Sequence, residues 1–143
     1  MMRRTHTAVG LASGFTLAYL QRDPLALGLA LALATQIAAV LPDQDLRLGL
    51  KHRGVTHSLL ALLLISTSLW QLDHRLALAV AVGYGSHLIL DSLTIWGIPL
   101  LWPAHNRFRL AKLRTGSGID HLLCLVALCG AILALYSMVQ VKV

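Results

Sequence analysis

Glutamate is absent from this chain, and charged residues of any kind are scarce. All six acidic residues are aspartates, and charged residues make up only 13% of the 143 residues. A soluble domain usually carries roughly 25% charged residues, so this chain has too few charges to cover a water-soluble globule of its size. Because there is no glutamate, any carboxylate chemistry must use the short aspartate side chain.

Cysteine is almost as rare. Cys124 and Cys129 lie five positions apart in one apolar segment, on different faces of the helix expected there. We expect both to be packing residues, and they indicate nothing about the redox compartment. The basic residues are scattered over several loops without interleaved aromatic residues, so the nucleic-acid binding typical of single-strand binders is not expected.

Long apolar segments are what the chain does have. Hydrophobic residues make up 57% of it, and its mean hydropathy is +0.71. Five segments are apolar enough to be helices in a membrane: Ala8–Leu20, Leu25–Leu41, Ser58–Leu72, Leu76–Leu93 and Ile119–Val141. Several are at or below the roughly 20 residues that a full span prefers. The composition therefore predicts one domain over residues 1–143, an all-α polytopic membrane bundle of about five short helices.

The first apolar segment has two interpretations. Arg3 and Arg4 precede it, as basic residues precede the apolar part of a signal peptide. However, glycine and hydroxyl residues interrupt the segment, and no clear small-residue cleavage site follows it. Gly10 and Gly14 instead form a small-xxx-small pair, which allows close helix packing. We expect a retained helix.

The net charge of +6 tests this arrangement. If the N-terminus is cytoplasmic and five helices cross the membrane, nine basic residues lie on the cytoplasmic side and three on the other. The nine are Arg3, Arg4, Arg47, Lys51, Arg53, Arg107, Arg109, Lys112 and Arg114, and the three are Arg22, Arg75 and Lys142. This distribution fits the positive-inside rule and predicts a multi-pass membrane protein whose N-terminus is cytoplasmic.

The same topology gathers the ligand-type residues at one membrane face. Eight of them fall at the cytoplasmic ends of the expected helices or in the loops beside them: His6, Asp43, Asp45, His52, His57, His87, Asp91 and Asp120. Charge counting places them there without using their chemistry. We therefore expect a site at this face, with the stretch Leu41–Ser58 at its centre.

His87 and Asp91 are the strongest pair. Their i, i+4 spacing places both on one helix face, and ionisable groups inside an apolar segment are costly and usually functional. They could grip one metal ion, or they could form a hydrogen-bonded pair that stabilises the bundle. Asp43 and His57 could complete a four-ligand shell. Zinc accepts such nitrogen and oxygen ligands, and manganese or iron would also fit them.

The remaining polar residues each have an ordinary alternative. His6 could be solvated and Asp120 could be a helix N-cap. Asp45 and His52 could orient ligands, act as a general base or be ordinary loop residues. His74 and His105 are expected to be peripheral. The basic group with Arg107 and Arg109 could reflect topology or contact with anionic headgroups, and it could hold a substrate phosphate, as Arg53 could.

Three blocks of sequence resemble a known family. LPDQD, HRGVTHSLL and GYGSHLILDSLTIWGIPLLWP, followed by RFRL and TGSGIDHLL, are similar to the YdjM-type family of bacterial inner-membrane proteins, regarded as metal-dependent hydrolases. The similarity covers most of residues 41–123 and the THTAVG start. It implies a multi-pass, metal-dependent hydrolase of the bacterial cytoplasmic (inner) membrane.

A more distant resemblance is to the zinc-dependent phospholipase C and single-strand nuclease superfamily. Its pattern has an Asp, a later His and a His-xxx-Asp pair, and here Asp43 and His57 are fourteen residues apart and followed by His87 and Asp91. The resemblance implies that these four bind one zinc ion. It also implies that Asp91 bridges to a second metal, which His6 would help to hold. Gly116 stands where a further His is expected, and only Asp120 remains of that pair, so one or two ions are expected.

Two functions are compatible with this pattern. The first is a hydrolase of a phosphoester or lipid-type substrate, in which a metal lowers the pKa of a bound water. Asp45, His52 or Asp120 would then move protons, and membrane lipids would be the surroundings and the source of an amphiphilic substrate. The second is a non-catalytic membrane protein, an interaction module or carrier, whose His and Asp residues hold a structural metal.

Overall fold

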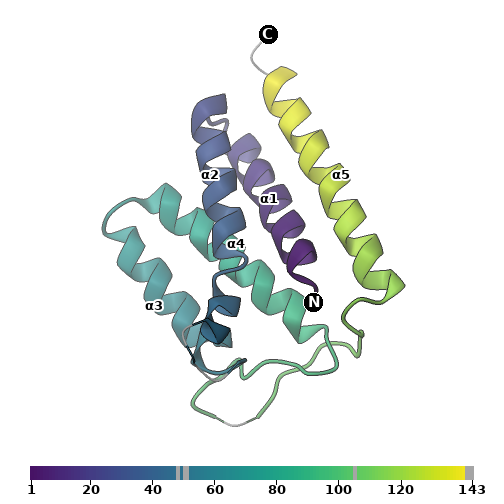
Figure 1. Cartoon of the computed structure of the whole chain (residues 1–143). Helices are drawn as coiled ribbons and strands as arrows, with labels where there is room; N and C mark the ends of the chain where they lie inside the picture. The colour runs from purple at the N-terminus through teal and green to yellow at the C-terminus, as the bar shows by residue number, and fades with distance from the viewer. Residues whose placement is uncertain (48, 50–51, 105, 141–143) are drawn as a thin grey trace.

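The computed structural model describes residues 1–47, 49, 52–104 and 106–140. Lys51, His105 and Lys142, which entered the sequence argument, lie outside these ranges. Within the described residues there are five α-helices and no strand, only two isolated bridges, so the all-α prediction is confirmed (Figure 1). The α-helices are α1 (Arg3–Leu20), α2 (Leu25–Ala38), α3 (Leu59–Trp70), α4 (His74–Ser92) and α5 (Gly118–Gln140).

Two short 3₁₀-helices carry the polar stretch between α2 and α3. They are η1 (Pro42–Leu46) and η2 (Val55–His57). The second apolar segment was predicted to run to Leu41, but α2 ends at Ala38. Proline disfavours helical backbone at the residue before it and has no N–H to donate, so Pro42 begins a new turn instead of continuing α2.

The first helix begins earlier than predicted. The first apolar segment was predicted to begin at Ala8, whereas α1 begins at Arg3. Asp120 explains the difference, because its carboxylate accepts hydrogen bonds from the Met2 N–H at 3.1 Å and from the Thr5 hydroxyl at 2.6 Å. A partner more than a hundred positions away thus caps the first turn of α1, and nothing local in the sequence indicates it.

α1 lies at the centre of the bundle, where it packs against α2, α4 and α5, while α3 packs on α4 (Figure 1). The predicted close approach at the glycine pair is confirmed. A Cβ atom on Gly10 would lie 2.5 Å from Ala39 Cβ, and one on Gly14 would lie 2.5 Å from Ala32 Cα. On α4, a Cβ on Gly83 would lie 2.1 Å from the carbonyl oxygen of Thr35. Both α1 and α4 therefore need glycine to reach α2.

Among the described residues, α5 is the one helix that is both long and apolar enough to cross a membrane, with a mean hydropathy of 2.5 over its best window. α2 and α3 are apolar but have only 14 and 12 residues. The structure therefore supports membrane association through α5 and does not fix the number of crossings.

The loop between α4 and α5 folds back under the end of α4. The Leu110 N–H donates to the Ser92 carbonyl at 2.8 Å, and the Leu113 N–H donates to the Leu93 carbonyl at 2.9 Å. This loop, η1, η2 and the N-terminus lie at the same end of the bundle (Figure 1). That end carries the polar residues singled out above.

Candidate metal centre

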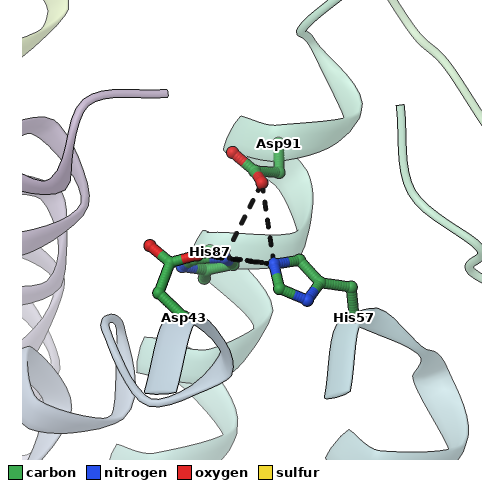
Figure 2. Close-up of side chains that lie close together, drawn as sticks. All are labelled: Asp43, His57, His87 and Asp91. Carbon is green, nitrogen blue, oxygen red and sulfur yellow. Dashed lines mark hydrogen bonds and ion pairs between the residues drawn. The ribbon is translucent and has the colours of Figure 1, made fainter. Parts of the chain in front are cut away.

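Four side chains from three separate segments converge at this end (Figure 2). Asp43, His57, His87 and Asp91 each offer one ligand atom, and these atoms all lie within 4.8 Å of one another. Asp43 lies on η1, His57 is the last residue of η2, and His87 and Asp91 lie one turn apart on α4. All but Asp43 are fully buried. The structure thus brings together the four residues that the spacing singled out.

The hydrogen bonds of the two histidines set which nitrogen faces the cluster. His87 Nδ1 lies 2.8 Å from the Ala39 carbonyl oxygen, which can only accept, so Nδ1 carries the hydrogen. His57 Nδ1 faces the Thr56 hydroxyl at 3.1 Å and Asp45 Oδ2 at 3.6 Å. Its hydrogen is therefore expected on Nδ1 as well. Both Nε2 lone pairs then point into the cluster, as they do in metal-binding histidines.

The Nε2 atoms of His57 and His87 lie 3.2 Å apart. Two lone pairs at this separation repel each other unless a cation or a proton lies between them. The carboxylates are also too far away for ordinary hydrogen bonds, since the imidazole–carboxylate distances are 3.5 and 3.6 Å to Asp43 and 3.7 and 3.8 Å to Asp91. Hydrogen bonding within the cluster does not account for its arrangement.

These separations fit a small divalent ion. Ligands at 2.0–2.1 Å from a tetrahedral zinc ion lie about 3.3 Å from one another. The five distances that involve an imidazole nitrogen range from 3.2 Å to 3.8 Å, and all four ligand atoms lie within 4.8 Å of one another, so modest shifts would close the group around an ion. The donor set of two imidazoles and two carboxylates suits zinc and also manganese or iron. The described residues therefore include a group that could hold a metal ion.

Asp43 is the member of the cluster most open to solvent, with a side chain 26% exposed. Burial alone would raise the pKa of its carboxyl group, but the nearby imidazoles of His57, His87 and His6 hold the pKa below its usual value. The carboxylate form, which a metal requires, is therefore favoured.

Asp45 organises the loop that presents His57. Its fully buried carboxylate lies 3.1 Å from His52 Nδ1, and it accepts from the Arg53 N–H at 3.1 Å and from the Thr56 hydroxyl at 3.2 Å. Asp45, His52 and His57 form a second group whose ligand atoms lie close enough to share an ion. Because Asp45 faces the Nδ1 side of His57, it orients that ring toward the four-residue cluster.

Arg53 lies against the cluster itself. Its backbone is in the left-handed region, with φ of 56°, and its N–H bond to Asp45 helps to hold that conformation. The guanidinium contacts Asp91 Oδ2 at 2.9 Å, the Thr94 hydroxyl at 3.0 Å and the Gly97 carbonyl at 3.2 Å. Arg53 was predicted to face substrate or phosphate, and in the structure its side chain bridges the end of α4 and the following loop.

His6 is placed beside the cluster. It is fully buried, its ring stacks on His87 with centroids 4.0 Å apart, and its Nε2 lies 3.2 Å from Asp91 Oδ1. The geometry is not that of a hydrogen bond, and neither ring nitrogen of His6 has a hydrogen-bond partner among the described residues. The Met1 nitrogen contacts the same Asp91 oxygen at 2.5 Å. Asp91 thus presents one oxygen to His57 and His87 and the other to His6.

Asp120 is not brought into the cluster. Besides Met2 and Thr5, it accepts from the Gly116 N–H at 2.8 Å, so its carboxylate already joins α1 to the start of α5.

Arg107 and Arg109 are both exposed in the loop between α4 and α5. Arg107 donates to the Trp96 carbonyl at 3.2 Å. His74 is exposed at the start of α4, at the far end of that helix from the cluster.

A cavity of about 370 Å³ opens beside the cluster. Asp43 and Asp91 form part of its wall, so a small molecule in the cavity would meet two of the four ligands. The rest of the wall is mostly polar or basic and consists of Met1, Arg3, Gln44, Arg47, His52 and Arg53. A neighbouring cavity of about 560 Å³ also includes His52 and Arg53 and reaches Arg107.

Sequence reasoning missed several groups that hold the site in place. The Ala39 carbonyl orients His87, and the Tyr84 hydroxyl donates to the Thr56 carbonyl. Backbone acceptors have no signature in a sequence, and Thr56 and Tyr84 are ordinary residue types. His121, which contacts Arg4 across α1 and α5, was not singled out either, although it follows Asp120 directly.

The fold and the site together define a class: an all-helical, membrane-associated protein with a buried His/Asp cluster that could hold a metal. The model of the YdjM inner membrane protein family matches residues 1–142, and the chain belongs to this family. The prediction of the family from its sequence blocks is thereby confirmed.

Two relatives illustrate the extent of the similarity. The inner membrane protein YdjM of Escherichia coli strain K12 is 36% identical over 83 residues, which cover 52% of this chain and 42% of that protein. The uncharacterized protein YvsG of Bacillus subtilis strain 168 is 33% identical over 142 residues, which cover 85% of this chain and 86% of that protein. The match thus spans less than half of the first relative and most of the second. No solved structure matches the chain.

Proposed function

We propose that this protein is a membrane-embedded metal-dependent hydrolase that acts on a phosphoester or lipid-type substrate at the cytoplasmic membrane face. The observation that carries the proposal is the cluster of Asp43, His57, His87 and Asp91, whose two Nε2 lone pairs face each other at 3.2 Å beside a cavity with basic walls. The resemblance to metal-dependent hydrolases, including the phospholipase C superfamily, adds to this support.

In the proposed function, the four clustered residues would hold the ion, and His6 would serve a second ion if one binds. A bound zinc ion would lower the pKa of a water molecule and polarise a phosphoryl oxygen. His52 Nδ1 faces Asp45 at 3.1 Å, so its Nε2 is the nitrogen free to accept a proton from water in the cavity. Asp120 would at most relay protons at the outer edge of the site.

The cations of the cavity wall suit an anionic substrate. Arg3, Arg47 and Arg53 line the same cavity as Asp43 and Asp91. Arginine binds phosphate through paired charge-assisted hydrogen bonds, so a phosphoester would be held with its phosphorus near the cluster. Arg107 and Arg109, exposed in the loop outside, are proposed to contact lipid headgroups.

We also propose the topology in which the N-terminus is cytoplasmic and all five helices cross or enter the bilayer. The distribution of nine basic residues against three supports it. So do the exposed leucines of α3, a helix with no buried residue, because such a surface is costly in water.

A second function has one specific observation in its favour. Four protein ligands close a tetrahedral shell, which is typical of structural zinc sites, whereas catalytic sites usually keep one position for water. In that case the ion would join η1, η2 and α4, and the protein would be an interaction module or a carrier. Asp43, the ligand most open to solvent, distinguishes the catalytic function from the structural one. A substrate could reach the ion only if Asp43 left it or if the ion took a fifth ligand.

The test uses the full chain purified in detergent. Elemental analysis should find one or two divalent ions per chain, and His87→Ala should lose them while His74→Ala, which removes an exposed histidine of the same helix, keeps them. A panel of phosphoesters and phospholipids should reveal hydrolysis that a chelator abolishes and added zinc restores.

Two results would contradict the proposal in different ways. Full metal content in His87→Ala would show that the ion lies elsewhere. Stoichiometric metal without chelator-sensitive hydrolysis of any substrate in the panel would favour the structural function.

A further inference from the structure

A further cavity, larger than the two described above, lies away from the cluster, between α1 and α5. It is an open groove of about 740 Å³, within the range of small-molecule binding sites. Its walls are formed mainly by successive turns of α1 and α5, with Gln36 of α2 also taking part. The lining residues used below are Arg3, Arg4, Leu11, His121, Leu125 and Leu128.

Polarity changes along this groove. Arg3 and Arg4, at the start of α1, and His121, at the start of α5, lie at one end. Arg4 Nη2 and His121 Nε2 are 2.5 Å apart, so the basic residues meet across the two helices. About one to two turns further along the helices, the walls are apolar: Leu11 on α1 and Leu125 and Leu128 on α5. A groove with a basic mouth and an apolar floor matches an amphiphile with an anionic headgroup.

The groove also lies where lipid chains would be. It runs along α5, the helix that is long and apolar enough to cross a membrane. Arg3 lines both this groove and the cavity beside Asp43 and Asp91. A headgroup bound at Arg3 would therefore lie next to the candidate metal centre.

A second copy of this chain is a poorer occupant. Its surface would have to offer acidic groups to Arg3, Arg4 and His121. Asp73, at the N-cap of α4, is the one exposed aspartate, while the other five are buried or partly buried. Within the described residues, a single exposed aspartate therefore offers little acidic surface to match the basic end of the groove.

We infer that the groove between α1 and α5 binds the acyl chain of a lipid with an anionic phosphate headgroup and delivers that headgroup to the metal centre. This inference rests on the proposed function for the fate of the headgroup, but the binding step stands without hydrolysis. It names the substrate class as phosphate-bearing lipids rather than soluble phosphoesters.

Binding is measured by native mass spectrometry of the full chain in nonionic detergent, with chelator present so that nothing is hydrolysed. Dioctanoyl phosphatidate should bind with a stoichiometry of one per chain. Dioctanoylglycerol, which lacks the phosphate, and inorganic phosphate, which lacks the chains, should each bind at least about tenfold more weakly, since each loses one half of the contacts.

Two matched pairs of variants locate the site. Leu128→Trp fills the groove and should weaken phosphatidate binding about tenfold or more, whereas Leu133→Trp, at an exposed position of α5 outside the groove, should not change it. Arg4→Gln should weaken binding about tenfold because a charge-assisted contact is lost. Its control is Arg114→Gln, which removes an exposed arginine outside the groove and should leave binding unchanged. All four variants should elute as the parent does.

Several outcomes would overturn the inference. These are unchanged binding in Leu128→Trp, equal losses in Leu128→Trp and Leu133→Trp, dioctanoylglycerol binding as tightly as phosphatidate, or a change of oligomeric state in Leu128→Trp without a change in lipid binding. If binding fails but chelator-sensitive hydrolysis of a soluble phosphoester remains, the groove inference is wrong and the proposed function stands. If phosphatidate binds but no substrate is hydrolysed, the groove inference stands and the proposed hydrolase function is wrong.

Discussion

Helices α4 and α5 are similar in length, with 19 and 23 residues, but they differ sharply in how many of their residues are buried. α4 has nine buried residues, including His87 and Asp91. α5 is the more apolar helix, yet only Asp120, Ala131 and Met138 are buried, and leucines and isoleucines such as Ile132 stay exposed, Ile132 by 70%. In a water-soluble protein the more apolar helix would be the more buried one.

This reversal extends through the whole bundle. The fully buried side chains include three histidines and three aspartates, whereas α3, also strongly apolar, has no buried residue. In water, such exposed apolar area would be costly and the polar interior would gain little. In a bilayer the leucines meet lipid, while the polar groups pair with one another inside the protein. The contrast between α4 and α5 is therefore the clearest structural support for membrane localisation.

The largest expected effect comes from comparing a buried leucine of α4 with an exposed leucine of α5. Leu88 of α4 is 4% exposed and packs with Tyr84 and Ile98, so Leu88→Ala should lower the free energy of unfolding by about 2–5 kcal/mol. Leu133→Ala on α5, at a position 65% exposed, should change it little, because lipid fills the space. Thermal unfolding in detergent measures both. Equal losses would show that α5 is packed against protein rather than lipid.

The next-largest effect concerns the buried polar groups that hold the metal ligands in place. Asp45→Asn leaves the shape of the loop but weakens the interaction that orients His57, so metal affinity should fall about 10–100-fold. Asp73→Asn is the matched control, since Asn also caps helices and this exposed position is remote from the cluster. Titration with zinc under a competing chelator gives both affinities. An unchanged affinity in Asp45→Asn would remove Asp45 from the orienting role.

The smallest effect tests how α4 is held. Gly83→Ala would place a Cβ 2.1 Å from the Thr35 carbonyl oxygen, and the resulting overpacking should destabilise the protein by about 1–3 kcal/mol. It should also weaken metal binding, because His87 lies one turn further along α4 and bonds to Ala39, one turn further along α2. Gly85→Ala meets no atom within 4 Å and should stabilise α4 by up to about 1 kcal/mol. Destabilisation by both variants would point to a general intolerance of substitution in α4.

Part of the site could be predicted because it depends on spacing and charge. The i, i+4 pair His87 and Asp91 shares a helix face whatever the tertiary structure, and charge counting placed Asp43 and His57 at the same end. His6 was expected only as a possible second-site ligand, and the structure stacks it on His87. Arg53 was predicted to face substrate, and the structure pairs its guanidinium with Asp91 in the wall of the cavity beside the cluster.

Composition and periodicity were sufficient for the class of the fold, five helices with a polar end, because apolar content and helix spacing are local properties of a chain. They were also sufficient for the close packing at Gly10 and Gly14. Tertiary structure alone decided that Asp120 caps α1 instead of joining the cluster, that Ala39 sets the tautomer of His87, and that a groove lies between α1 and α5. Each of these depends on groups far apart in sequence whose distance is set by packing, and no local pattern records it.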